Sequence, residues 1–396
     1  MTIHDLSKIK KAANYLSQLD EKSRNCFLYN LAENLMIKKE AIIQANLSDI
    51  RMAEKEKLSS SFIQRLCLDT AGLGLITHKL TKLSRLKSRL GSVIEKRKRA
   101  DGLSLKKVVT PLGVIFVIFE ARPEVTIDVA ALCLKSGNAA ILKGGREANN
   151  TNKILYGCIL DALDKSKIYK GAISLISERN RKISDWLLQQ HNFIDLVIAR
   201  GGYVMVKSVI EKSKIPVLAH AAGGARIYVD ESADLKIAEK IIINAKTDKP
   251  AACNSLDTIV IHRRIAKKFI KQISKKLDEH KVNIVKDFNT EFLGLTVSIK
   301  IVDNADEATD FINKYTKGHS EGIVAADKKI IEKFNKSIDA AAIFVNCSSR
   351  LHDGYEFGMG SEMGIATGKL HARGPVGLRE LATYKWIIEG EGHVRN

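Results

Sequence analysis

Cys253 stands near the centre of the segment NAKTDKPAACNSLD, residues 244–257. An amphipathic helical pattern precedes this segment and an apolar run, residues 258–262, follows it, so we expect the cysteine in a loop that leads into a strand. A thiol in such a loop is a candidate nucleophile. Burial in the core is the commoner fate of a free cysteine, and the neighbouring residues alone leave both interpretations open.

The other cysteines lie far apart, with no C-x-x-C pair and no Cys/His cluster at zinc spacing. We therefore expect reduced thiols, as in the cytoplasm, and no metal site. Cys347 is a second candidate nucleophile, but its setting in VNCSS at the end of a predicted strand indicates packing. The complete set is Cys26, Cys67, Cys133, Cys158, Cys253 and Cys347.

The formal net charge of +19 first suggests a nucleic-acid partner. Lysine and arginine are interleaved with acidic residues along nearly every predicted helix, and the dense run EKRKR, residues 95–99, has no alternating aromatic residues for base stacking. The charge favours capture of small polyanions, or it is a solvated lysine-rich surface. We therefore expect no nucleic-acid partner. We also expect no membrane binding, since every apolar run is too short to span a bilayer. The chain opens without a signal-peptide pattern, so a cytoplasmic protein is expected.

The 396 residues exceed what one hydrophobic core usually serves, so two main domains are expected. Residues 7–87 show helical periodicity. Apolar runs then alternate with helical patterns in two series, which predicts an α/β fold with two Rossmann-like parallel sheets. Ligands of such sheets bind where the strands end, near residues 120–123, 143–146, 200–202 and 220–224.

Between the helical segment and the first series, Asp101 and Gly102 separate two extended runs. This residue pair favours a tight hairpin turn in which both residues have positive φ. Such a projecting hairpin serves oligomerisation or is a plain surface ribbon. We predict a cofactor-binding domain of residues 1–92 and 111–220, rejoined by 373–382; an oligomerisation hairpin and C-terminal strand of residues 93–110 and 383–396; and a catalytic domain of residues 221–372.

Five segments resemble a known family over essentially the whole chain: EARPEVTIDVAALCLKSGNAAILKGG, DLVIARGG, DKPAACNSLDT, HSEGIV and FGMGSEMGIATGKLHARGPVGLRELATYK. They are similar to the gamma-glutamyl phosphate reductases of the aldehyde dehydrogenase superfamily. The resemblance implies an aldehyde dehydrogenase-like fold. It also implies NADPH-dependent reduction of L-glutamyl 5-phosphate to L-glutamate 5-semialdehyde in proline biosynthesis, through a cysteine thioester.

Under this resemblance Cys253 matches the superfamily nucleophile, and its backbone N–H, helped by Asn254, would stabilise the oxyanion. Arg122 replaces a superfamily asparagine and would hold the acyl phosphate in two-pronged fashion, or it pairs with a neighbouring glutamate. Many relatives carry asparagine where this chain has Glu124, and we expect that carboxylate not to face the substrate.

The resemblance also implies the cofactor contacts. Lys143 matches the lysine that contacts the adenosine ribose, and Arg146 replaces a glutamate of NAD-preferring relatives, which favours NADP. Gly201 and Gly202 match a turn that passes close to the cofactor. Glu291 matches the nicotinamide-ribose glutamate, or it is a solvated acid.

Oxidising aldehyde dehydrogenases carry a water-activating glutamate in an E-L-G-G segment, and here the segment is HAAGG, residues 220–224. A reductase gains by lacking that base, because its thioester must survive water. The reductase family more often has His-Gly-Asp-Gly, so this segment is a local departure. Residues in matching motifs that would hold the substrate carboxylate, or would serve only structure, are His220, His319, His371 and Arg373.

The expected partners are a small-molecule substrate, further copies of the chain in a dimer or tetramer, and the glutamate kinase of the same pathway. One alternative function is another aldehyde dehydrogenase or acyl-CoA reductase of the same fold. A second is a basic scaffold or nucleic-acid binder without catalysis, whose binding would persist at high salt.

Overall fold

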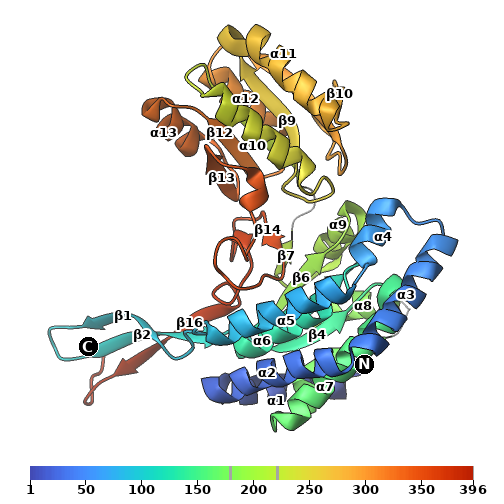
Figure 1. Cartoon of the computed structure of the whole chain (residues 1–396). Coiled ribbons are helices and arrows are strands. Elements are labelled where there is room, and N and C mark those ends of the chain that lie inside the picture. Colours follow the sequence, from blue (N-terminus) through green and yellow to red (C-terminus); the bar gives the residue numbers. More distant parts are fainter. Residues whose placement is uncertain (178–180, 220–222, 396) are drawn as a thin grey trace. The chain divides into compact units, whose positions relative to one another are not determined.

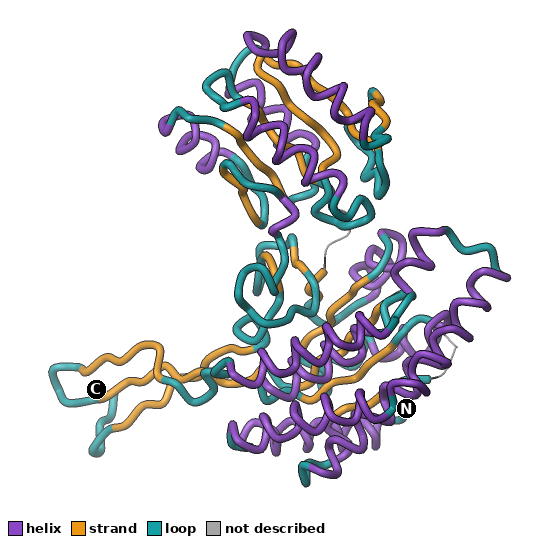
Figure 2. Tube along the Cα trace, in the orientation of Figure 1, coloured by secondary structure: helices purple, strands orange, loops and turns teal. Residues whose placement is uncertain are grey.

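The computed structural model describes residues 1–177, 181–219 and 223–395 (Figure 1). Its contacts divide the chain into two compact units. Unit 1 comprises Met1–Leu218, Gly358–Gly364 and Val376–Asn396, and unit 2 comprises Ala219–Phe357 and Ile365–Pro375. Each unit is built around its own parallel sheet, which confirms the predicted α/β class with two such sheets (Figure 2).

Unit 1 begins with helices, as the periodicity of residues 7–87 predicts. Side chains at several N-termini accept a backbone N–H; Thr2 and Asp5 form a reciprocal capping box, and Asp20 and Asp69 each cap a later helix. The first helix buries an apolar stripe that includes Leu6, Ile9 and Leu16. These helices are α1 Ile3–Gln18, α2 Glu21–Ile37, α3 Lys39–Lys55, α4 Ser60–Leu66 and α5 Thr70–Arg85.

The sheet of unit 1 has the strand order β5-β4-β3-β6-β7 within the described residues. The central strand β3 is buried along its whole length, as expected for a parallel sheet covered on both faces. Its strands are β3 Val114–Phe119, β4 Ala139–Lys143, β5 Ile173–Leu175, β6 Leu196–Arg200 and β7 Val217–Ala219. The connecting helices are α6 Glu124–Lys135, η1 Arg146–Ala148, α7 Asn149–Lys165, η2 Lys170–Ala172, α8 Arg181–Leu187 and α9 Tyr203–Lys212.

A separate antiparallel sheet of unit 1 has the order β1-β2-β16, formed by β1 Val93–Lys98, β2 Ser104–Pro111 and β16 Ala382–Glu389. The predicted hairpin is present, but its turn differs from the prediction. Gly102 has φ +95° whereas Asp101 does not have positive φ. The reason is a longer loop, in which the Gly102 N–H donates to the Arg99 carbonyl and the Arg99 N–H donates to the Leu103 carbonyl. One glycine then suffices for the reversal.

Unit 2 contains a parallel sheet of order β10-β11-β9-β8-β12-β13 in the described part of the chain. Strand β9 is buried throughout. The strands are β8 Ala225–Val229, β9 Leu256–His262, β10 Asn283–Val285, β11 Thr296–Val302, β12 Ser320–Val324 and β13 Ala342–Val345. The helices are α10 Leu235–Thr247, α11 Arg263–Glu279, α12 Ala305–Tyr315, α13 Lys328–Ser337 and η3 Ser349–Leu351.

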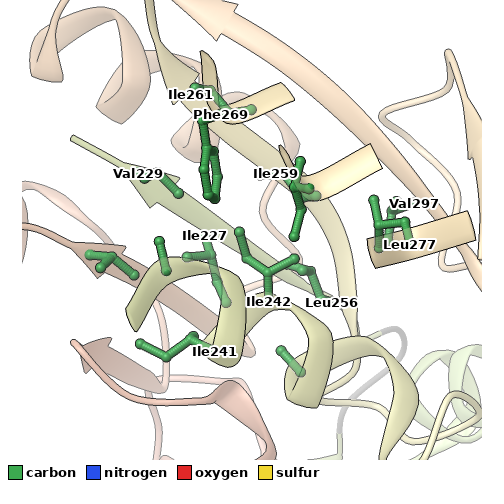
Figure 3. Close-up of a cluster of buried hydrophobic side chains, with 14 of the residues drawn as sticks. Ile227, Val229, Ile241, Ile242, Leu256, Ile259, Ile261, Phe269, Leu277 and Val297 are labelled. Atoms are coloured by element: carbon green, nitrogen blue, oxygen red, sulfur yellow. The ribbon is translucent and has the colours of Figure 1, made fainter. Parts of the chain in front are cut away.

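One core of unit 2 lies between this sheet and α10 and α11 (Figure 3). Ile227 of β8 and Ile259 of β9 meet Ile242 of α10 and Phe269 of α11, and all four side chains are at most 1% exposed. Burial of these side chains fixes β8 and β9 side by side. The loops at the amino ends of these two strands are thereby held next to each other.

The boundaries between the units differ from the predicted residues 221–372. Gly358–Gly364 belongs to unit 1, where Gly360 packs on Leu83 and Leu86 and the Ser361 hydroxyl lies 3.1 Å from Asp128. The chain returns to unit 1 at Val376 rather than at residue 373. The pairing of β14 Ile365–Ala366 with β15 Gly374–Pro375 keeps the intervening loop in unit 2. Assignment of the units to cofactor and catalysis stays a prediction.

Across the described ranges, none of the helices combines the length and the apolar character that crossing a membrane requires.

Candidate active site

Cys253 lies in a tight turn between α10 and β9, as the sequence predicts for a loop that feeds a strand. The Ser255 N–H donates to the Ala252 carbonyl at 3.0 Å and closes the turn. The side chain of Cys253 is half-buried, unlike the fully buried Cys133 and Cys158. Of the two interpretations that the sequence leaves open, this partial exposure favours a thiol that can react over a core thiol.

Two glycines form the wall behind the Cys253 turn. A Cβ on Gly223 would lie 2.2 Å from the Cys253 carbonyl oxygen and 2.7 Å from its Cβ, so only glycine fits. Gly224 has φ +92° and donates its N–H to the same carbonyl at 2.6 Å. Residues 220–222 lie outside the described residues, so the predicted substrate residue His220 has no place in this description.

Asn254 anchors the turn from its other side. Its Nδ2 donates to the His352 carbonyl at 3.0 Å, and its Oδ1 accepts from the Arg350 guanidinium. The Ser349 hydroxyl donates to the Asn254 carbonyl at 2.7 Å. These contacts engage the amide in holding the turn to η3, which favours a positioning role for Asn254 over the predicted contact with the oxyanion.

Beneath the turn lie two ionisable side chains that are almost fully buried. Lys246 of α10 is 0% exposed and Asp257 of β9 is 2% exposed, with Nζ and Oδ1 3.6 Å apart. Lys246 Nζ also lies 3.3 Å from the Ser255 hydroxyl within the turn. Burial raises the pKa of Asp257 to about 7, against the opposing effects of Lys246 and Arg226. Burial lowers the pKa of Lys246.

Glu291, the predicted ribose ligand, is near this pair. Its charge partly opposes the lowering of the Lys246 pKa by burial and adds to the rise of the Asp257 pKa. The N–H of its neighbour Phe292 donates to Asp257 Oδ1 at 3.3 Å. The structure therefore brings Glu291 into the surroundings of the Cys253 turn.

The predicted substrate residues differ in their surroundings. His319 is fully buried, with Nδ1 2.8 Å from the Ser320 hydroxyl, which in turn lies 2.8 Å from His352 Nδ1. Arg373 donates to Asp339 at 2.6 Å, and this bond together with one from Lys369 holds the Asp339 pKa below its usual range. These contacts favour structural roles for His319 and Arg373. His371 is exposed in the loop between β14 and β15.

In unit 1, Arg122 follows β3 in a loop whose second residue, Ala121, has φ +47°. The Ala121 N–H donates to the Glu147 carboxylate at 2.7 Å, which fixes this strained backbone. Arg122 and Arg200 both act on half-buried Glu124, whose pKa is nevertheless raised because burial outweighs them. Arg122, which follows β3, and Arg200, which ends β6, thus place two guanidinium groups at the carboxyl end of the sheet.

Lys143 and Arg146, the predicted cofactor residues, line a pocket where β4 and β5 end. Arg146 is 71% exposed and pairs with Glu56 at 3.2 Å. The described residues that line the pocket offer two cations, hydroxyl and amide groups, and no carboxylate; this donor set fits a ribose that carries a phosphate. The lining is Lys143, Gly144, Gly145, Arg146, Asn149, Asn152, Leu175, Ile176 and Ser177.

Gly201 and Gly202 form the turn between β6 and α9, also in unit 1. The Gly202 N–H donates to the Glu120 carboxylate at 2.8 Å. A Cβ on Gly201 would lie 2.5 Å from the same carboxylate, so Glu120 packs directly on this backbone. The Glu120 carboxylate therefore contacts the turn that the sequence predicts to lie close to the cofactor.

The sequence prediction missed Lys246 and Asp257. The apolar setting of Asp257 in LDTIVIH is the one local signal of a buried carboxyl group, while Lys246 reads as an ordinary helix residue. Among the residues described, no group of three or more His, Cys, Asp or Glu side chains is placed to hold a metal ion.

The Gly223 contact makes a prediction about the thiol. Gly223→Ala places a methyl group 2.2 Å from the Cys253 carbonyl oxygen, so the turn must move. We expect the rate of Cys253 alkylation by iodoacetamide to change by about tenfold, since small displacements of a reacting group have large effects. Peptide mass spectrometry of the full chain measures this rate.

Gly294→Ala is the matched control, because the nearest atom to its new Cβ would be 3.6 Å away. An alkylation rate in Gly223→Ala equal to that of Gly294→Ala would show that the glycine wall does not set the thiol's position.

Residues 6–292 match the aldehyde dehydrogenase family. An acetylating aldehyde dehydrogenase from Geobacillus thermoglucosidasius, 16% identical, superposes over 99% of this chain and 97% of that chain with a TM-score of 0.74. At that identity the likeness supports the shared fold alone.

Closer relatives cover both proteins from end to end. A gamma-glutamyl phosphate reductase of Caldanaerobacter subterraneus subsp. tengcongensis is 41% identical over 98% of each chain, and one of Clostridium kluyveri is 40% identical over 100% of each. The crystal structure of the Thermotoga maritima gamma-glutamyl phosphate reductase, 37% identical, matches 100% of this chain and 99% of that chain with a TM-score of 0.95. The chain therefore belongs to the gamma-glutamyl phosphate reductases, within the aldehyde dehydrogenase family.

Proposed function

We propose that this oxidoreductase of proline biosynthesis reduces L-glutamyl 5-phosphate through a thioester on Cys253, with NADPH as the hydride donor. The observation that carries the proposal is the half-buried Cys253 thiol in a turn backed by Gly223 and Gly224. A fixed turn holds the sulfur in one place, and orientation of the reacting atoms is a large part of catalysis.

The chain's own groups account for the acyl transfer. The Cys253 thiolate forms a bond to the acyl carbon, the carbon–oxygen bond to phosphate breaks, and phosphate leaves with its electron pair. The backbone N–H of Cys253 is the donor for the developing oxyanion, while Asn254 keeps the turn in place. After reduction, the carbon–sulfur bond breaks and the sulfur regains its electrons as the semialdehyde is released.

Arg122 is our candidate for binding the phosphate of the substrate. A guanidinium matches phosphate geometry with two parallel hydrogen bonds, and Arg122 follows β3 at the carboxyl end of its sheet. Burial raises the pKa of nearby Glu124, although Arg122 and Arg200 oppose the rise.

Bound NADPH supplies the hydride that the side chains of this protein cannot. Lys143 and Arg146 would hold its adenosine ribose and phosphate in the pocket at the ends of β4 and β5. Arg146 would then exchange Glu56 for the cofactor phosphate. Glu291 would hold the nicotinamide ribose.

The sequence His-Ala-Ala-Gly-Gly at residues 220–224 supports reduction rather than hydrolysis. It offers no carboxylate to activate water, so the thioester persists until it is reduced.

We also propose that the sheet of β1, β2 and β16 joins copies of the chain. Both of its outer strands expose apolar side chains, including Ile94 at 48% and Ile388 at 59% exposure. Outer strands of this kind favour pairing with another chain.

The thioester mechanism is tested in the reverse direction with semialdehyde, phosphate and NADP. Cys253→Ser should lower kcat roughly a thousandfold or more, because a serine hydroxyl is a far weaker nucleophile than a thiolate. Without phosphate, the wild type should form only about one equivalent of NADPH per subunit, since the acyl group stays on sulfur. Absorbance of NADPH measures both quantities.

Cys347→Ser is the matched control, because Cys347 is also half-buried in unit 2. Its activity should equal that of the wild type. Continuous turnover without phosphate, or full activity in Cys253→Ser, would contradict the mechanism.

Cofactor choice gives a separate test. Arg146→Glu removes the cation beside the proposed phosphate and places a carboxylate there, so kcat/KM with NADP should fall about tenfold or more while that with NAD does not fall. Lys170→Glu makes the same charge change on an exposed lysine outside the pocket and should alter neither value. Equal effects of Arg146→Glu on both cofactors would exclude a phosphate contact.

A further inference from the structure

Asp257 is the point where four segments of unit 2 meet. It lies in β9, and its Oδ1 is 3.6 Å from Lys246 Nζ of α10 and accepts the Phe292 N–H at 3.3 Å. Its Oδ2 packs on Gly224, where a Cβ would be only 2.0 Å away. The side chain therefore touches a helix, a glycine turn and the segment of Glu291.

The Gly224 contact extends to the nucleophile. Gly224 donates its N–H to the Cys253 carbonyl at 2.6 Å. Lys246 approaches the same turn from below, through the Ser255 hydroxyl at 3.3 Å. Asp257 and Lys246 thus support the Cys253 turn at two points without contacting the thiol in any bond described above.

Burial of the ionisable side chains of Asp257 and Lys246 costs free energy, so their position calls for an explanation. Within the described residues, Asp257 Oδ2 is buried without a hydrogen-bond partner, an arrangement that costs free energy and that packing alone does not require. A hydrophobic pair of similar volume would cost less. A role in the reaction explains why the carboxyl group stands there.

We propose that Asp257 is a positioning residue, whose ionised carboxylate, paired with Lys246, holds the Gly224 turn, the Cys253 turn and the Glu291 segment in the register that the reaction needs. This inference rests on the proposed role of Cys253. In this proposal Asp257 and Lys246 act on the reaction by positioning the Cys253 turn, and neither side chain touches the substrate.

The charged groups around Asp257 fix the direction of its pH dependence. Burial raises its pKa to about 7, Lys246 of α10 and Arg226 of β8 oppose the rise, and Glu291 reinforces it. Arg226 is itself paired with buried Glu321 at 3.2 Å. Above about pH 7 the carboxylate is ionised and its hydrogen bond from Phe292 is strengthened by the charge; below it the group is neutral and this support weakens.

The test compares Asp257→Asn with the wild type in the phosphate-dependent reverse reaction across neutral pH. At about pH 8 the variant should lose about tenfold to a hundredfold in kcat, with little change in the KM of the semialdehyde, because the turn is misplaced. At about pH 6 the difference should be about fivefold to tenfold smaller than at about pH 8, since only about a tenth of the wild-type carboxyl groups are then still ionised. A defect that shrinks with falling pH is not expected of a merely structural residue.

Asp230→Asn is the matched control. Asp230 is also buried, at 4% exposure, but follows β8 at the opposite end of the sheet, where it accepts the Tyr228 hydroxyl. Its pH profile should follow that of the wild type. A kcat ratio between Asp257→Asn and wild type that stays constant with pH, or an equal effect of Asp230→Asn, would overturn the proposal.

Two further measurements separate this inference from the proposed function and from misfolding. The rate of Cys253 alkylation by iodoacetamide needs no turnover, and its ratio between wild type and Asp257→Asn should depart from unity only above about pH 7. Lys246→Met keeps the carboxyl group but removes its counterion, which raises the pKa of the carboxyl group. The pH-dependent change in the Cys253 alkylation rate should therefore lie about one pH unit higher in this variant than in the wild type. An unchanged alkylation profile in both variants would overturn the inference even if the reverse reaction proceeds as proposed.

Discussion

The structure depends on one close contact, in which the backbone of Gly223 and Gly224 packs directly against the Cys253 turn. A Cβ on Gly223 would lie 2.2 Å from the Cys253 carbonyl oxygen, and a Cβ on Gly224 would lie 2.0 Å from Asp257 Oδ2. The contact joins the amino ends of β8 and β9, which the core of Ile227, Ile259 and Phe269 already holds side by side (Figure 3). Core burial and the reactive turn are therefore parts of one arrangement.

Around that contact, polar groups limit the freedom of the turn. Asn254 ties it to η3, and Lys246 and Asp257 support it from beneath. Each of these groups is buried, so each hydrogen bond acts in a medium where its loss is costly. A half-exposed nucleophile in a rigid turn suits acyl transfer, because the sulfur is already oriented when the substrate binds.

Sequence patterns predicted much of the fold, because burial on both faces of a parallel strand leaves a run such as VIFVIF that local sequence alone displays. They also placed Lys143 and Arg146 at the end of β4 and Cys253 before β9. They did not predict the buried pair of Lys246 and Asp257, since a lysine on an amphipathic helix looks solvated until the tertiary structure covers it. The positive φ predicted for Asp101 was wrong for a similar reason: the backbone hydrogen bonds of Arg99, and not the Asp-Gly pair itself, determine the turn.

The central claim is that the acyl group of the substrate passes through the sulfur of Cys253. Mass spectrometry of the wild-type chain, quenched in acid after incubation with semialdehyde and NADP but without phosphate, tests it most directly. The account predicts a glutamyl group on the peptide that contains Cys253, which hydroxylamine removes as it does other thioesters. An adduct on the Cys347 peptide instead, or NADPH formation with no adduct on Cys253, would contradict it.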